Sequence, residues 1–171
     1  MKLKNIYLGI DPGKDGAVVA INDDGVVAGS FMTARDFTTT IGKSSKREYL
    51  PSRMSYAIKC LGGKHNIKLA VVEKQSARPG QGVSSTFSTG FGYGLWVGIL
   101  AAQGIPFVEV RPRTWTSHIL RDVPGEGKSR SVYAVMNRMP DLDLTPGLKR
   151  KPHDGLADAG CLALYAYHLE V

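Results

Sequence analysis

Four acidic residues of this 171-residue chain stand where their carboxylates could converge on one site. Asp11 follows the apolar run 6–10, and Glu73 follows a second apolar run. Asp154 and Asp158 open a C-terminal segment with helical spacing, and a separation of four places both carboxylates on one helical face. Like charges at this spacing repel each other, whereas a shared divalent cation stabilises them. The sequence therefore predicts a carboxylate-lined metal site.

The chemistry of such a site follows from its donor atoms. Oxygen ligands without a cysteine cluster favour Mg²⁺, with Mn²⁺ as a substitute, over zinc. Two such ions, roughly 3.5 to 4 Å apart, can activate a water and stabilise the leaving oxygen of a phosphodiester. We therefore predict a nuclease in which the four carboxylates both bind metal and carry catalysis: Asp11, Glu73, Asp154 and Asp158.

Each of these residues also has a purely structural interpretation. Asp11, in Asp-Pro-Gly, is compatible with an ordinary strand-end turn. Glu73 could pair with Lys74 or Arg78, and Asp154 could cap the helix that it opens. The neighbouring His153 is expected to hydrogen-bond at the helix start rather than to bind metal.

Composition indicates a globular protein with a polyanionic partner. Hydrophobic residues make up 43% of the chain, and the formal net charge is +7, which favours nucleic acid binding. Cys60 and Cys161 lack the spacing of a zinc site or a disulfide framework, so both are expected to be buried apolar residues. The apolar runs are too short to cross a membrane, and we expect a soluble, cytoplasmic protein without a membrane partner.

The order of elements predicts one α/β domain over residues 1–171. Three short apolar runs with tight polar turns predict an antiparallel meander, and alternating helices and strands follow it. This order fits a ribonuclease H-like fold with a mixed five-stranded sheet, three antiparallel strands followed by parallel ones, flanked by helices and with the first strand central. The expected later elements are a helix over 49–61 stopped by Gly62-Gly63, a strand over 68–73, a helix toward the end of 83–103, a strand over 107–110 and a helix over 155–168. Loops are expected at 122–130 and 141–151, and a mobile surface loop that could also touch phosphates is expected at 35–47.

Basic and polar residues lie around the predicted ends of these elements. Some follow Glu73 in a glycine-containing connection, some follow the strand at 107–110, and others precede the last two helices. Phosphate contact is the functional interpretation, and a helix-entry loop or a solvated charged face is the structural one. The predicted DNA-binding residues are Arg78, Gln81, Arg111, Arg113, Lys128, Arg130, Lys149, Arg150 and Lys151.

Several short motifs carry a family resemblance along nearly the whole chain. They are Gly9-Ile10-Asp11-Pro12-Gly13, Val72-Glu73, Arg78-Pro79-Gly80-Gln81-Gly82, Pro112-Arg113-Thr114-Trp115 and the stretch from His153 to Ala159. The chain resembles the RuvC-like Holliday junction resolvases, crossover junction endodeoxyribonucleases, and is similar to their compact phage and bacterial members. The resemblance implies a ribonuclease H-like fold, a homodimer and Mg²⁺-dependent cleavage of branched DNA, above all four-way junctions. The family's acidic tetrad maps onto Asp11, Glu73, Asp154 and Asp158.

Two departures from the family pattern concern the substrate. The final acidic pair is four residues apart here and three apart in well-studied cellular members. Ser76 stands where those members often carry an aromatic wedge, and Phe87 or Phe91 is the candidate replacement. A two-fold symmetric junction requires two active sites, so the segment 83–103 is expected either to form a dimer interface or to pack on the sheet.

Two other functions remain open at this stage. The same carboxylates would serve a ribonuclease H-like nuclease that acts on flaps, replication forks or RNA–DNA hybrids. A non-catalytic junction-binding protein is the alternative outside the enzymes, although all four carboxylates are present.

Overall fold

A computed structural model of the chain describes residues 3–42, 46–77, 79–147 and 149–170. Its main strands are β1 (Asn5–Asp11), β2 (Ala17–Asn22), β3 (Val27–Met32), β6 (Asn66–Glu73) and β7 (Phe107–Val110). They form one sheet in the order β3-β2-β1-β6-β7, antiparallel from β3 to β1 and parallel from β1 to β7. The predicted mixed five-stranded sheet with the first strand at its centre is confirmed.

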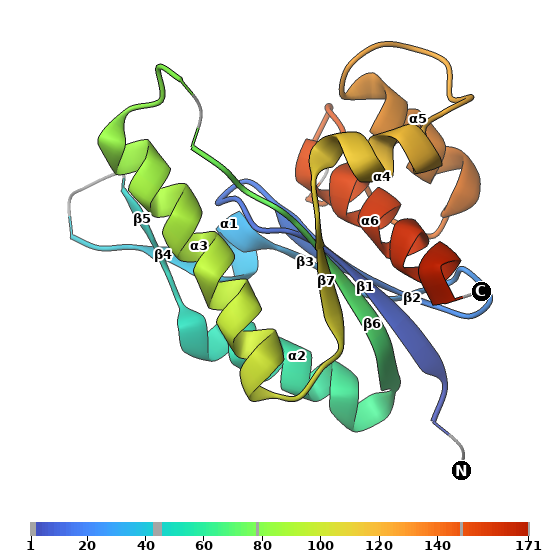
Figure 1. Ribbon diagram of the computed structural model, residues 1–171, viewed down its shortest axis with the longest axis horizontal. Coiled ribbons are helices and arrows are strands. Elements are labelled where there is room, and N and C mark those ends of the chain that lie inside the picture. Colours follow the sequence, from blue (N-terminus) through green and yellow to red (C-terminus); the bar gives the residue numbers. More distant parts are fainter. Residues whose placement is uncertain (1–2, 43–45, 78, 148, 171) are drawn as a thin grey trace.

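Helices cover both faces of this sheet (Figure 1). The helices of one face are α4 (Pro112–Ile119), α5 (Ser129–Arg138) and α6 (Asp154–Glu170), and those of the other are α2 (Pro51–Lys64) and α3 (Val83–Ala102). Two hydrophobic cores result, one on each face. Tyr7 of β1 packs into the core with α6, whereas Ile6 and Leu8 pack into the core with α2 and α3. Burial on both faces explains why β1 reads as a continuous apolar run rather than an alternating one.

A close approach between α6 and β1 brings the start of α6 to the sheet edge that holds the site. A Cβ atom on Gly9 would lie 2.8 Å from the carbonyl carbon of Leu162, closer than side-chain atoms pack in proteins. Only glycine therefore allows α6 to lie this low on the central strand. The first turn of α6 is thereby held beside the turn that follows β1.

The segment 35–47, predicted as a loop, contains regular structure. It begins within α1 (Thr33–Asp36) and continues into β4 (Thr38–Thr40), which pairs antiparallel with β5 (Arg47–Tyr49). Residues 43–45 between these strands lie outside the described residues. Phe37 anchors the segment because its buried ring packs edge-on against Trp96, with ring centroids 5.4 Å apart. Three consecutive threonines also favour an extended backbone.

Two smaller predictions are also wrong. Gly62 and Gly63 do not stop α2, which continues to Lys64 and ends where the His65 backbone N–H donates to the Leu61 carbonyl. Glycine lowers helix propensity, but burial of the apolar stripe on α2 outweighs that cost. Cys161 is buried as expected, whereas Cys60 is partly exposed. In the part of the chain that the structure describes, no helix has the length and apolar character needed to cross a bilayer.

Candidate active site

The parallel pairing of β1 with β6 places Asp11 beside Glu73. Ile10 is paired with Val72, so the next residue of each strand, a carboxylic acid, ends its strand at the same sheet edge. Burial, followed by the charges of Glu73 and Asp158, raises the pKa of Asp11 to about 7. Three of the four predicted carboxylates therefore act on one another electrostatically, although they are far apart in the sequence.

Glu73 is held by two side-chain hydrogen bonds. The indole N–H of the buried Trp115 donates to its Oε1 at 2.9 Å, and the Gln75 amide donates to its Oε2 at 3.1 Å. Burial and the charge of Asp158 raise the pKa of Glu73, while these two hydrogen bonds oppose the rise. The indole comes from α4 and the amide from the connection after β6, so two elements fix the orientation of this carboxylate.

The start of α6 presents the other two carboxylates. His153 caps the helix, because its Nδ1 accepts a hydrogen bond from the Leu156 backbone N–H at 3.1 Å. This confirms the predicted helix-start role, and burial followed by the Lys149 charge lowers the pKa of the imidazole. The Asp154 side chain is 52% exposed and that of Asp158 is 17% exposed.

Lys128 lies next to both carboxylates of α6. Its Nζ is 3.8 Å from Asp154 Oδ2 and 3.8 Å from Asp158 Oδ2. Burial raises the pKa of Asp158, and a hydrogen bond from Ser131 and the charge of Lys128 oppose the rise. Lys128 was predicted to contact phosphate, and in the structure without DNA it is a counter-ion of the acidic cluster.

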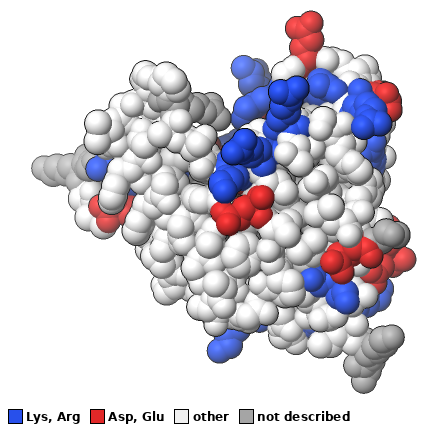
Figure 2. Space-filling view, in the orientation of Figure 1, with Lys and Arg blue, Asp and Glu red and all other residues white. Residues whose placement is uncertain are grey.

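The other predicted DNA-binding residues occupy different surroundings. Arg111 follows Val110, which pairs with Glu73, so Arg111 lies at the site's edge of the sheet, and Arg113 is in the first turn of α4; both are exposed. Figure 2 shows Lys and Arg side chains gathered over α4 on this face. Lys149, Arg150 and Lys151 are exposed in the loop before α6.

The remaining predicted DNA-binding residues are Arg130, Gln81 and Arg78. The Arg130 guanidinium donates to the carbonyl of Val123 at 3.1 Å and to that of Leu120, so it holds its own loop, and phosphate contact there stays a prediction. Gln81 donates to the Ser85 hydroxyl at 3.2 Å near the start of α3. Arg78 lies outside the described residues.

The side chains of the cluster are of the type that binds a divalent metal ion. Among the described residues, no three Asp, Glu, His or Cys side chains are grouped closely enough to hold an ion as they stand. However, the carboxylates raise one another's pKa, so the cluster carries negative charge that a cation would relieve. Carboxylate oxygens without sulfur are the ligands of Mg²⁺ or Mn²⁺.

Comparison with known proteins gives the fold. The chain matches no model of a protein family and no curated protein. Among solved structures, it is similar to Thermus thermophilus RuvC in complex with a Holliday junction substrate, with a TM-score of 0.62, 16% identity and coverage of 96% of this chain and 94% of that one. The fold is that of RuvC. A second T. thermophilus RuvC structure gives a TM-score of 0.54 at 17% identity, over 96% of this chain and 95% of that one.

A eukaryotic structure shares the RuvC fold as well. The yeast mitochondrial Holliday junction resolvase Ydc2 gives a TM-score of 0.62 at 14% identity, covering 98% of this chain and 79% of that one. The predicted ribonuclease H-like architecture is therefore confirmed over almost the whole chain.

Some residues at or beside the candidate site had no role among the sequence predictions. Trp115 belongs to a motif of the resemblance, but nothing in the sequence indicated that its indole N–H would reach Glu73, 42 positions away. Lys14 was likewise not predicted, and Arg47 was covered only as the last residue of the segment 35–47; both lie next to the turn that follows Asp11. A basic residue directly after Asp-Pro-Gly was the available signal for Lys14.

Proposed function

We propose that this protein is a divalent-metal-dependent endonuclease that resolves four-way DNA junctions by paired symmetric nicks. One observation carries the proposal: on the RuvC fold, carboxylates from β1, β6 and α6 act on one another at a single sheet edge. The similar structures include a RuvC bound to a Holliday junction, and the net charge of +7 suits a DNA substrate.

Four carboxylates would hold the metal, and two neighbouring side chains orient one of them. Asp11, Glu73, Asp154 and Asp158 would hold Mg²⁺, which when bound polarises the scissile phosphate and lowers the pKa of an attacking water. Trp115 and Gln75 keep the two Glu73 oxygens in fixed directions.

Nearby basic residues prepare the same site for a phosphate. Lys128 offsets the negative charge of the cluster before DNA arrives, and its ammonium can then pair with a phosphate oxygen. Arg111 and Arg113 add exposed guanidinium groups at the sheet edge that carries Glu73.

A homodimer would supply the second active site that paired nicks require. The surface of α3 suits such a contact, because a methyl group added at Gly90, Gly94 or Gly98 would meet nothing within 4 Å among the described residues. The alternative prediction for this segment, packing on the sheet, is confirmed, since Trp96 and Leu100 of the same helix are buried against it. The α3 helix can therefore pack on the sheet and still present a face of small residues to a partner copy.

A pair of exposed aromatic residues near the start of α3 suits the junction centre. Phe87 is 73% exposed and Phe91 is 49% exposed, and their rings stack with an interplanar angle of 9°. Exposed apolar rings are costly in water but can stack on unpaired bases. They replace, in this proposal, the aromatic wedge that Ser76 does not supply.

The host cytoplasm, where junction DNA is accessible, is the proposed location.

Cleavage of an end-labelled, immobile four-way junction in Mg²⁺ tests this function. Wild-type protein is compared with Asp11→Asn and with Asp24→Asn, a control that makes the same change on the exposed β2–β3 turn. Symmetric paired nicks that disappear only in Asp11→Asn, with junction binding retained, are the expected result. Binding without cleavage in either Mg²⁺ or Mn²⁺ would refute the nuclease, and cleavage restricted to flaps or forks would refute the junction as substrate.

A further inference from the structure

A basic hollow of about 640 Å³ lies next to the carboxylate cluster and has no role in the site described above. It is formed between the turn after β1, strand β5 and the first two turns of α3. Its lining combines three cationic side chains, those of Lys14, Lys46 and Arg47, with several hydroxyl groups, among them those of Ser84, Ser85 and Ser88. Asp15 contributes one carboxylate, so cations outnumber anions among these lining residues.

Contacts within the chain give this hollow a defined wall. The Lys14 ammonium donates to the Arg47 carbonyl at 2.5 Å, and the Arg47 guanidinium donates to the Lys14 carbonyl at 3.0 Å. The same guanidinium pairs with Asp15 at 2.8 Å. Lys14 also lies over the ring of Tyr49, 5.4 Å from its centroid. These contacts engage only some of the five N–H donors of a guanidinium and the three of an ammonium group.

The hollow is rigidly connected to the carboxylates. Lys14 is three residues after Asp11, which places their Cα atoms within about 10 Å of each other. The Tyr49 hydroxyl donates to the Pro12 carbonyl at 3.3 Å. On the other side, a Cβ atom on Gly155 of α6 would lie 2.8 Å from the Gly16 Cα. The turn thus contacts β5 on one side and α6 on the other, which keeps Lys14 near Asp11.

A second hollow lies between Glu73 of the carboxylate cluster and the basic hollow. It has a volume of about 460 Å³ and is lined by Gln75, whose amide donates to Glu73, and by Thr89. Thr89 also lines the basic hollow. Side chains that can form hydrogen bonds therefore line the surface from Glu73, around the start of α3, to Lys14.

We propose that the basic hollow binds the phosphodiester group of a nucleotide neighbouring the one that is cut. This inference rests on the proposed cleavage of DNA and adds the position of a second phosphate site to it. Ammonium and guanidinium groups with nearby hydroxyls are the groups that contact phosphate oxygens in protein–nucleic acid complexes. Fixing two phosphates of one strand aligns the scissile bond better than fixing one.

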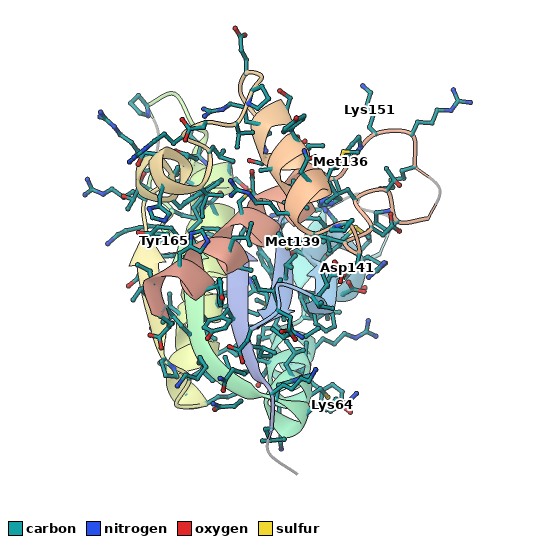
Figure 3. The ribbon with its side chains drawn as sticks, turned by 90° about the vertical axis from the view of Figure 1, so that its right-hand side faces the viewer. Lys64, Met136, Met139, Asp141, Lys151 and Tyr165 are labelled. Atoms are coloured by element: carbon teal, nitrogen blue, oxygen red, sulfur yellow. The ribbon has the colours of Figure 1, made fainter. Side chains whose placement is uncertain are left out.

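Binding in EDTA tests the hollow separately from cleavage, because no metal-dependent step can occur. The affinity for a fluorescent four-way junction is measured over a range of salt concentrations for Lys46→Ala and for Lys64→Ala. Lys64 lies at the end of the molecule opposite Lys151, on α2, and serves as the matched charge control (Figure 3). Lys46→Ala should bind about 5- to 10-fold more weakly near 0.1 M salt and reduce the slope of log K against log salt by about 1. Equal slopes in the two variants would overturn the proposal.

A phosphate scan locates the contact. Single methylphosphonates, which are neutral, replace each phosphate around the cut, and their effects are compared between wild type and Ser88→Asp. Ser52→Asp on α2 is the control with the same added charge. One neighbouring position should weaken wild-type binding severalfold but have no further effect in Ser88→Asp, because that contact is already lost.

The two proposals can fail independently. If the scan finds no position at which the methylphosphonate and Ser88→Asp effects overlap, the hollow is not a phosphate site, whatever the outcome of the cleavage assay. If the overlap is present but the junction is never nicked, the phosphate site stands and the nuclease proposal fails. Circular dichroism of each variant confirms that weaker binding does not reflect unfolding.

Discussion

Replacing Asp11 by asparagine should stabilise the metal-free protein at neutral and alkaline pH. Burial and the neighbouring charges of Glu73 and Asp158 raise the pKa of Asp11 from 3.8 to about 7. Between these two values the folded protein binds more protons than the unfolded chain, so its free energy of unfolding falls as the pH rises. The penalty is absent below the lower value and complete above the higher one. A neutral amide avoids it.

The size of this effect follows from the pKa shift. A shift of about three pKa units corresponds to about 4 kcal/mol of destabilisation above pH 7. The Asp11 side chain keeps partial contact with solvent, and an amide oxygen accepts the hydrogen bond from the Gly13 N–H more weakly than a carboxylate does. Allowing for both, we expect Asp11→Asn to gain about 2 kcal/mol at pH 8 and nothing near pH 4.

Urea unfolding in EDTA at pH 4.5, 6 and 8 measures this gain. Asp24→Asn, an exposed turn substitution, should leave the free energy of unfolding nearly unchanged at every pH. Adding Mg²⁺ should then stabilise the wild type more than Asp11→Asn, because binding to the folded state alone raises its stability. A gain that is the same at pH 4.5 and pH 8, or a loss at pH 8, would refute the assignment of electrostatic strain to this cluster.

Three further substitutions test other parts of the site. Trp115→Phe removes the hydrogen bond to Glu73 and part of a buried side chain, and should lower the free energy of unfolding by about 2–3 kcal/mol in urea titrations. An unchanged urea midpoint would contradict this expectation. Lys128→Met removes a cation beside two carboxylates, so Mn²⁺ should bind the variant about 3- to 10-fold more tightly in calorimetry. Weaker binding by the variant would count against a metal site there. Gly92→Ala places a methyl group 3.0 Å from the Pro12 carbonyl and should cost about 2 kcal/mol in thermal melts. Gly63→Ala in α2, with nothing within 4 Å among the described residues, should be neutral or stabilising, and equal effects of the two substitutions would exclude the packing argument.

The central strands were predictable because their sequence pattern is set by burial alone. β1 and the second half of β6 are buried on both faces, so they appear as apolar runs, 6–10 and 69–72, that each end at an acidic residue. Once two parallel strands are adjacent, their final residues share an edge, and the proximity of Asp11 and Glu73 follows. The spacing of Asp154 and Asp158 similarly fixed their common helical face.

Contacts that depend on tertiary folding were not predictable. β4 and β5 are three residues each, too short for a periodic pattern, and are held by the buried Phe37. The hydrogen bonds of Arg130 to carbonyls of its own loop were not predicted, since an isolated arginine carries no sign of its partner, and its contact with DNA stays a prediction. The pairing of Lys128 with α6 likewise depends on how α5 packs against α6, which local sequence does not encode.

The close packing of α6 on β1 also has a consequence for the protein during its synthesis. Asp11 and Glu73 leave the ribosome early, and β1 remains uncovered on one face until α6 has been made. The last two carboxylates arrive with the same helix that covers that face. A growing chain can therefore hold no complete acidic cluster, and a truncated product that lacks α6 would have an exposed apolar strand and an incomplete site. Such a product would be prone to aggregation.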